Sequence, residues 1–204
     1  MTARRTFRSS SIAWILNSPV SDKSLSSRVK RNRLIILLAF SFIQMHIEKR
    51  IIELGLTLPQ STGPVGKFTY IPCRRSGNLV FVSGQLPKKE ISTGQVEIRK
   101  GKVGIETTLD EAKEAAKYCG LNILSVLKDA IKDLDRVTAV IKVDGFVNCV
   151  ETFTDHPLVI NGCSDLFVDV FGATIGAHAR AAVGCSSLPL GVPVEIAAVF
   201  EVRE

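Results

Sequence analysis

Apolar residues repeat at a spacing of three and four along residues 109–130, which predicts a long helix with one buried face. Thr108 and Glu111 have the spacing of a capping box, so we expect this helix to begin after Thr108. A shorter helix is predicted over residues 46–54, where apolar residues share one face and Gly55 supplies a C-terminal stop. Each helix therefore needs an apolar surface against which to pack.

Extended segments are predicted where apolar and polar residues alternate between turn-forming residues. They cover residues 67–72, 79–86, 95–99 and 137–147, with a turn at 76–78 and a loop over 87–95. A further helix is predicted to open at Pro157, which suits the first helical position, and to end at Gly172. Two helices packed on one face of a mixed sheet give a single α+β domain, which we place over residues 45–204.

Residues 178–202 form one of the most apolar stretches of the chain, yet they contain Arg180. A period of two predicts a strand on each side of the loop 186–193, and hence a wide hairpin. The same period puts four residues of the first strand on one face: His178, Arg180, Ala182 and Gly184. In a symmetric hairpin Arg180 and Glu195 share a face and are offset by up to four residues, roughly 13 Å. A half-buried guanidinium needs an anionic partner, either a ligand or an acidic side chain at the sheet rim.

Positive charge is concentrated in the first 44 residues, which hold six Arg and two Lys against the single acid Asp22. The remaining 18 basic and 19 acidic residues nearly cancel, so the predicted domain is close to neutral. Non-specific binding to nucleic acid needs a basic surface on the folded part of a protein. After residue 50 the sequence has no basic stripe interleaved with aromatic residues, so no nucleic-acid partner is predicted.

The basic extension over residues 1–44 has two interpretations. Its Ser- and Arg-rich composition is typical of an organelle transit segment. Alternatively, Met45 is the functional start and the extension belongs to a longer gene product. The apolar run from Leu34 to Ile43 is about half the roughly 20 residues that a membrane span requires, so stable membrane insertion is not expected. The expected location is the cytoplasm, the mitochondrial matrix or another organelle.

The sequence carries no recognisable motif for a metal or an organic cofactor. Its five cysteines lack CxxC spacing and its three histidines are scattered, so neither a zinc site nor a disulfide framework is predicted. No G-x-G-x-x-G follows a predicted strand, and the segment GPVGK at 63–67 is too short for a phosphate loop. G-x-S-x-G is also absent. We therefore expect neither a nucleotide cofactor nor a serine nucleophile.

Three segments together resemble the RidA/YjgF family of reactive-intermediate deaminases, also known as endoribonuclease L-PSP or translation-inhibitor proteins. They are VFVSGQLP at 80–87, the capped helix after Thr108, and HARAAVGCSSLPLGVPVEIAAVF at 178–200. The resemblance spans roughly residues 68–203. The segment MHIEKRIIELGLTLP further resembles the first residues of a bacterial-type subgroup, which favours Met45 as an ancestral start. The resemblance implies a chorismate-mutase-like α+β fold and a compact homotrimer with ligand clefts between subunits.

The resemblance also implies a role for individual residues. Arg180 matches the family Arg that holds a substrate carboxylate, and Glu195 matches the Glu that orders or activates water. Tyr70 and Asn161 match residues that line the cleft, although Tyr70 could instead pack at an interface and Asn161 could instead pair locally. The implied reaction is hydrolysis of a small 2-imino acid, or its enamine, to a 2-keto acid and ammonia, without a metal or an organic cofactor.

Three departures from the family pattern leave other functions open. Ala182 stands where many active deaminases carry Cys, so its position can offer a substrate backbone groups alone. Ala197 stands where many members carry a second acid, and the stretch between Asn161 and Arg180 is longer than usual. A non-catalytic trimer that binds a metabolite or acts as a regulator is the main alternative. An endoribonuclease or translation inhibitor is less favoured, because the domain is nearly neutral and lacks an aromatic stacking surface.

Overall fold

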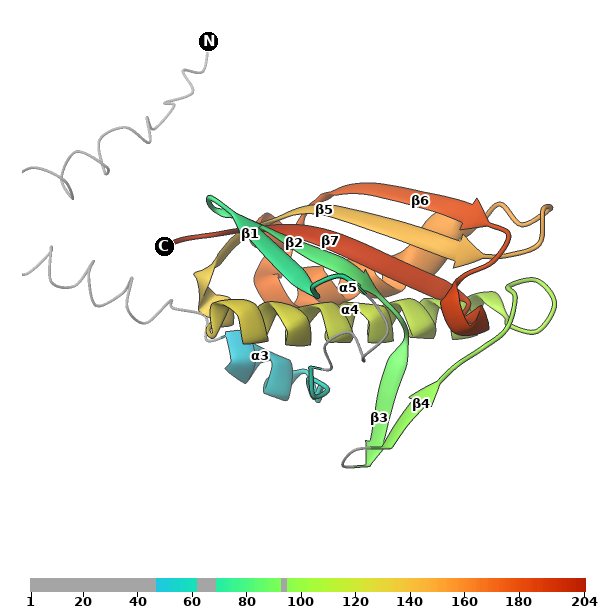
Figure 1. Cartoon of the computed structure of the whole chain (residues 1–204), viewed down its shortest axis with the longest axis horizontal. Coiled ribbons are helices and arrows are strands. Elements are labelled where there is room, and N and C mark those ends of the chain that lie inside the picture. Colours follow the sequence, from blue (N-terminus) through green and yellow to red (C-terminus); the bar gives the residue numbers. More distant parts are fainter. Residues whose placement is uncertain (1–46, 62–68, 93–94) are drawn as a thin grey trace, which may run out of the picture. The chain divides into compact units, whose positions relative to one another are not determined.

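A five-stranded mixed sheet forms one layer of the fold, and two long helices cover one of its faces (Figure 1). The computed structural model describes residues 47–61, 69–92 and 95–204, within the compact unit Met45–Glu204. The predicted extension over 1–44 lies outside the described residues. In spatial order the strands are β1 (Cys73–Ser76), β2 (Leu79–Gln85), β7 (Val194–Val202), β5 (Val137–Asn148) and β6 (Ala179–Cys185). β6 runs parallel to β5, and the other neighbours are antiparallel, so the predicted α+β class is confirmed.

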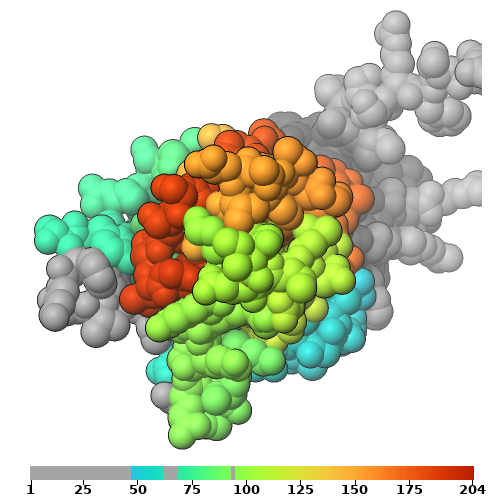
Figure 2. Space-filling view, turned by 90° about the vertical axis from the view of Figure 1, so that its right-hand side faces the viewer, coloured from blue at the N-terminus to red at the C-terminus, as the bar shows by residue number. Residues whose placement is uncertain are grey.

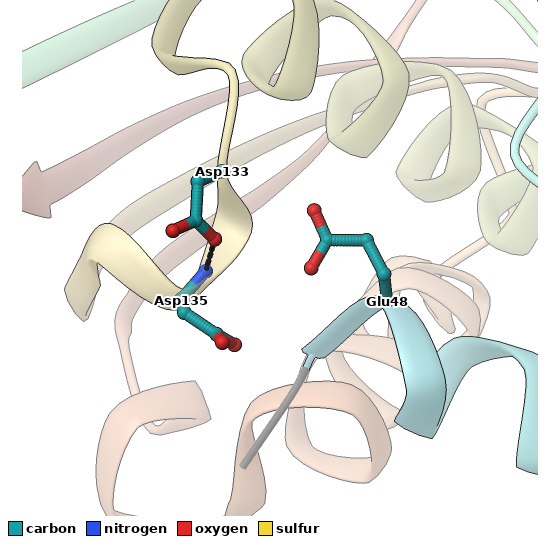
Figure 3. A group of neighbouring side chains, drawn as sticks. All are labelled: Glu48, Asp133 and Asp135. Atoms are coloured by element: carbon teal, nitrogen blue, oxygen red, sulfur yellow. Dashed lines mark hydrogen bonds between the residues drawn. The ribbon is translucent and has the colours of Figure 1, made fainter. Parts of the chain in front are cut away.

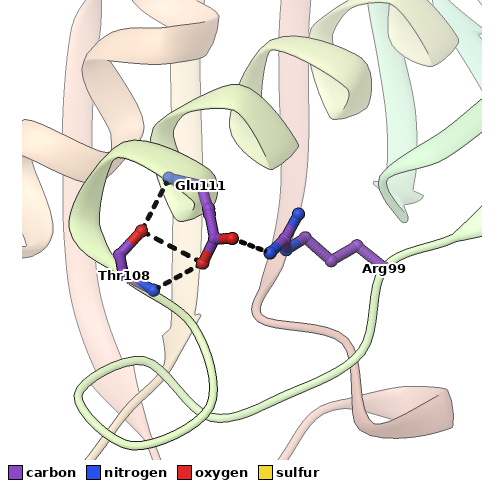
Figure 4. A network of polar contacts seen from close by, with 3 residues as sticks. All are labelled: Arg99, Thr108 and Glu111. Carbon is purple, nitrogen blue, oxygen red and sulfur yellow. Dashed lines mark hydrogen bonds and ion pairs between the residues drawn. The ribbon is translucent and has the colours of Figure 1, made fainter.

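The helix α4 (Leu109–Ile131) begins where the sequence predicts. The Glu111 amide donates a hydrogen bond to the Thr108 hydroxyl at 3.3 Å, and the Thr108 amide donates one to the Glu111 carboxylate at 2.9 Å (Figure 4). Arg99 forms an ion pair with the other oxygen of this carboxylate. The hydrogen bonds from Thr108 hold the pKa of Glu111 below its ordinary value. The predicted capping box is confirmed, and it fixes the start of the buried face of α4.

The helix α5 (His156–Gly176) packs against β5 and beside α4. Gly172 interrupts it with φ 78° and ψ 162°, but a second helical segment continues to Gly176, beyond the predicted end. Phe167 of α5 contacts Phe200 of β7 with ring centroids 5.6 Å apart, and both side chains are buried. The core therefore lies between the two helices and the sheet face that they cover.

Two of the amino-terminal strands differ from those predicted, whereas β2 and β4 lie where the sequence predicts them. The strand β1 replaces the strand expected at 67–72, of which residues 67 and 68 lie outside the described residues. The segment expected as a loop forms β3 (Lys88–Ser92), which pairs with β4 (Gln95–Ile98). This hairpin projects from the body of the fold (Figures 1 and 2). Most of its residues are exposed on both faces. The sequence of β3 therefore lacks the alternation of apolar and polar residues that marks a strand with one buried face.

A short helix, α3 (Ile47–Glu53), packs against the 3-10 turn η1 (Leu134–Arg136) that precedes β5. The first amide of α3 donates to Asp135 Oδ1 at 2.6 Å, and the first amide of η1 donates to Glu48 Oε1 at 3.3 Å. The helix ends before Gly55, which has φ 68°, so the predicted stop is confirmed. Reciprocal capping joins α3 to the turn before β5.

The predicted hairpin of residues 178–202 is wrong. β5 lies between β6 and β7, and the loop that joins them contains the 3-10 turn η2 (Pro189–Gly191). Alternation shows that each strand buries one face, but it does not say which strands are neighbours. Arg180 pairs with the buried Val143, whereas Glu195 pairs with the exposed Phe146 on the same strand. Arg180 therefore points to the helix-side face and Glu195 to the opposite, open face, which corrects the prediction that they share a face.

Candidate functional site

Arg180 lies on an edge strand, where its guanidinium meets the helix α5. Its Nη1 donates to Asn161 Oδ1 at 2.7 Å and to Ser164 Oγ at 3.1 Å. These two bonds use both hydrogens of Nη1. Within residues 47–61, 69–92 and 95–204, no partner is found for Nε or Nη2. The free edge carries two parallel N–H groups, the arrangement that binds a carboxylate through two hydrogen bonds.

The structure brings three of the residues expected in the site together. Asn161 is half-buried on α5 and contacts Arg180 directly. Ala182 follows Arg180 by two residues on the same face of β6, half-buried and packed against the core. Ser164 was not predicted as a site residue, although its spacing of three from Asn161 puts it on the same side of the helix. This half of the site therefore combines one edge strand with one helix.

Glu195 lies on the open face, over β2. A Cβ atom at Gly84 would come within 2.0 Å of Glu195 Oε1, so the absence of a side chain at Gly84 makes room for the carboxylate. Glu195 is half-buried, and no hydrogen bond to its carboxylate is found among the described residues. Burial raises the pKa of Glu195 above its ordinary value. A carboxylate with a raised pKa is a better proton acceptor near neutral pH than an exposed one.

Within one chain, the structure does not bring Arg180 and Glu195 together. The strand β5 separates their strands, and their register differs by three residues, so their backbones are about 14 Å apart at usual strand spacings. Tyr70 lies three residues before β1, which is the opposite edge strand from β6. The predicted site residues thus fall into two groups, with Arg180, Asn161 and Ala182 at one edge and Glu195 and Tyr70 toward the other.

Two further clusters have ordinary structural explanations. Oxygen atoms of Glu48, Asp133 and Asp135 lie within 4.8 Å of one another (Figure 3). Each of these carboxylates accepts a hydrogen bond from a backbone amide of α3 or η1, so the cluster serves to cap these elements. Cys149 Sγ lies 3.4 Å from His156 Nε2. Burial raises the pKa of the Cys149 thiol, which keeps it protonated and unreactive at neutral pH.

By length and composition, α5 is the one helix among the described residues that could cross a membrane. Its apolar side chains include Val159, Phe167 and Val170, all fully buried against the rest of the fold. A core helix of this length passes the same test, so the finding is weak evidence for a span.

We expect Glu195→Gln to stabilise the fold at pH 8. The raised pKa means that the folded chain holds the proton more tightly than the unfolded chain. The ionised carboxylate thus costs stability above its folded pKa, and the cost disappears below the unfolded pKa. Because Glu195 is partly exposed, we expect a gain of only about 1–3 °C in melting temperature. Thermal melts at pH 4 and pH 8 check this; a lower melting temperature at pH 8 would show that the carboxylate has a stabilising partner.

Comparison with known sequences identifies relatives over most of the chain. Residues 48–200 match the family described as "YjgF/chorismate mutase-like, putative endoribonuclease". Protein TCP17 of Trypanosoma cruzi is 40% identical over 151 residues, which cover 74% of this chain and 91% of that protein. Protein HMF1 of Saccharomyces cerevisiae is 27% identical over 145 residues, which cover 70% of this chain and 92% of that protein.

Solved structures have the same fold. The protein Atu1372 of Agrobacterium tumefaciens, described as of unknown function, is 42% identical with a TM-score of 0.69, covering 81% of this chain and 99% of that one. A protein of Shewanella oneidensis described as a putative endoribonuclease is 27% identical with a TM-score of 0.69, covering 76% of this chain and 99% of that one. The resemblance seen in the sequence is confirmed, and the chain belongs to the YjgF/RidA family, whose fold is chorismate-mutase-like.

Proposed function

We propose that this protein hydrolyses small 2-imino acids, or their enamines, to 2-keto acids and ammonia. The observation that carries the proposal is the guanidinium of Arg180, pinned to α5 through Nη1 with its Nε and Nη2 edge open. A carboxylate on that edge would have both its charge and its orientation fixed. The imine carbon, one bond away from the carboxylate, would then be held in a defined position for attack.

Glu195 is the residue that we assign to water. In the proposed reaction the water oxygen bonds to the imine carbon, and the proton that water loses passes to the Glu195 carboxylate. That proton then moves to the nitrogen, which gives a carbinolamine. The carbinolamine hydroxyl next gives its own proton to Glu195, which passes it to the nitrogen; the C–N bond breaks, and ammonia leaves as the carbonyl forms. The half-buried position and raised pKa of Glu195 support this exchange, because they favour proton transfer in both directions near neutral pH. Apart from the imino acid itself, water is the only reactant in this scheme.

We propose that the complete site forms between copies of the chain in a homotrimer. The open face of the sheet exposes Phe81, Phe146 and Val183, with exposed fractions of 44%, 38% and 46%. Apolar side chains on an unpaired sheet face favour an interface. A ring of three chains would let Arg180 of one chain meet Glu195 and Tyr70 of the next, groups that one chain keeps apart. Light scattering of the full chain in solution tests this proposal, because a homotrimer has three times the molecular mass of one chain.

A second candidate function is metabolite binding without turnover. Ala182 has no side-chain group to act on a ligand, and Ala197 adds no second acid beside Glu195. Both proposals use Arg180 for a carboxylate, and they differ in whether ammonia is released. An endoribonuclease activity has less support, because the 18 basic and 19 acidic residues outside the first 44 leave little net charge to bind phosphates.

The test of the proposed function follows the decay of 2-iminobutanoate and 2-iminopropanoate, made in situ by a threonine or serine dehydratase. We expect the full chain to accelerate release of the keto acid and ammonia above the spontaneous rate. No acceleration, together with measurable binding of 2-oxobutanoate, would favour the metabolite-binding function. Cleavage of RNA without imine hydrolysis would instead favour the endoribonuclease.

A further inference from the structure

A chain of directed hydrogen bonds lies behind Arg180. Ser164 Oγ accepts from Arg180 Nη1 at 3.1 Å and lies 3.0 Å from His178 Nε2. His178 Nδ1 lies 2.6 Å from the carbonyl oxygen of Gly176. Ser164 and His178 are both half-buried. None of these contacts belongs to the backbone pairing of β6 with β5, so they are additional to what holds the strand in place.

The direction of each bond follows from the groups involved. A carbonyl oxygen can only accept, so Nδ1 of His178 carries the proton that is donated to Gly176. In the neutral ring Nε2 is then an acceptor, and the Ser164 hydroxyl donates to it. The Ser164 oxygen consequently presents its lone pairs to Arg180 Nη1. With a neutral imidazole, this set of directions satisfies all three side chains at once.

The segment that distinguishes this chain in sequence also builds this arrangement. The helical turn after Gly172 brings the Gly176 carbonyl to His178. The ring of Phe167 lies edge-on to the ring of His178, with centroids 6.3 Å apart, and Phe167 itself is fully buried. A core residue and a backbone carbonyl thus fix the imidazole, which fixes the hydroxyl that contacts the guanidinium.

We propose that Ser164 and His178 are positioning residues that hold the Nε and Nη2 edge of Arg180 toward a carboxylate ligand. The inference rests on the carboxylate-binding role of Arg180 in the proposed function. Arg180 is exposed and has a long flexible side chain, so one bond to Asn161 would leave the guanidinium plane free to turn about that bond. The second bond from the same nitrogen, to Ser164, fixes the plane before the ligand arrives.

Four variants of the full chain test the proposal. Ser164→Ala removes the hydroxyl, whereas Ser164→Thr retains it. His178→Phe keeps a ring against Phe167 but has no acceptor, whereas His178→Gln supplies an acceptor near the place of Nε2. Ser92→Ala, on the projecting hairpin β3–β4, is the control. Melting temperature and molecular mass identify any variant that fails to fold or assemble.

The readouts are the dissociation constant of 2-oxobutanoate, a stable carboxylate, and the separate values of kcat and KM for imine hydrolysis. We expect Ser164→Ala and His178→Phe to weaken binding and raise KM about tenfold, with kcat changing much less, because the bond acts on ligand binding. Ser164→Thr and His178→Gln should recover most of the affinity. A global structural defect would lower kcat and the melting temperature together and would show no such recovery.

The two proposals can fail separately. If wild-type protein binds 2-oxobutanoate but does not hydrolyse imines, the proposed function fails and the binding data still decide the role of Ser164 and His178. If imines are hydrolysed while Ser164→Ala and His178→Phe bind and react as the wild type does, the positioning role is overturned. Absence of carboxylate binding by folded wild-type protein would overturn both.

Discussion

Gly162→Ala is expected to destabilise the fold by about 3 kcal/mol, although alanine favours helix formation over glycine by about 1 kcal/mol. A Cβ atom at Gly162 would lie 1.9 Å from the backbone oxygen of Lys113, where α5 crosses α4. Backbone atoms within a helix cannot move aside alone, so the two helices must separate. For a domain of this length, a loss of about 3 kcal/mol corresponds to a fall in melting temperature of roughly 6–12 °C. The melting temperatures should be compared at one fixed protein concentration.

Gly120→Ala is the matched control for this prediction. A Cβ atom there would lie 2.8 Å from Leu166 Cδ2 and 3.1 Å from Cys163 Sγ, which are side-chain atoms at the same crossing. The end of a leucine can change rotamer, so we expect a smaller loss than at Gly162. Equal melting temperatures for wild type and Gly162→Ala would show that the helices are not as close as the structure places them. Because Gly162 lies between Asn161 and Ser164, the variant should also weaken carboxylate binding.

The elements that the sequence predicted well are those with a strong burial pattern or a local hydrogen-bonding motif. α4 follows its apolar repeat and its capping box, and β5 follows its alternation. The projecting hairpin was missed at β3 because neither of its faces is mainly buried. The break at Gly172 was predicted, but the helical turn after it was not. Whether a helix resumes after such a break depends on packing against distant segments, which the local sequence does not show.

For the site, periodicity predicted correctly that His178, Arg180, Ala182 and Gly184 share a face. A Cβ atom at Gly184 would lie 2.5 Å from His156 Nε2, and Arg180 contacts α5, so both point to the helix side. The relation of Arg180 to Glu195 was predicted wrongly, because strand order depends on pairing between distant segments. Ser164 and His178 could have been found from their spacing to Asn161 and Arg180, since spacings of three in a helix and two in a strand share a face.

Arg180→Ala is expected to lower kcat/KM for 2-imino acids by about 10²- to 10³-fold, to the point where spontaneous hydrolysis dominates. The substitution removes the charge and both N–H groups of the open edge, and the substrate carboxylate would then be held without a cationic partner. The same variant should lose binding of 2-oxobutanoate. Arg180 is exposed on an edge strand, so we expect little change in melting temperature, which separates the loss of binding from unfolding.

Arg180→Lys distinguishes charge from geometry. Lysine keeps the positive charge but offers one ammonium group, which cannot contact Asn161 and Ser164 while presenting two parallel donors to a carboxylate. We expect about 10- to 50-fold lower kcat/KM, between wild type and Arg180→Ala. Arg50→Ala, on α3 and away from the sheet, is the control for removing an arginine and should keep wild-type activity.

The pattern across these three variants decides what Arg180 does. Full activity in Arg180→Lys would mean that charge alone attracts the substrate, and the open edge of the guanidinium would have no special role. Full activity in Arg180→Ala would mean that the substrate carboxylate binds elsewhere in the fold. That result would overturn the role of Arg180 in the proposed function. A graded loss, largest for Ala and intermediate for Lys, requires the arrangement that the structure holds ready: one nitrogen fixed to α5, and two parallel N–H groups left for the ligand.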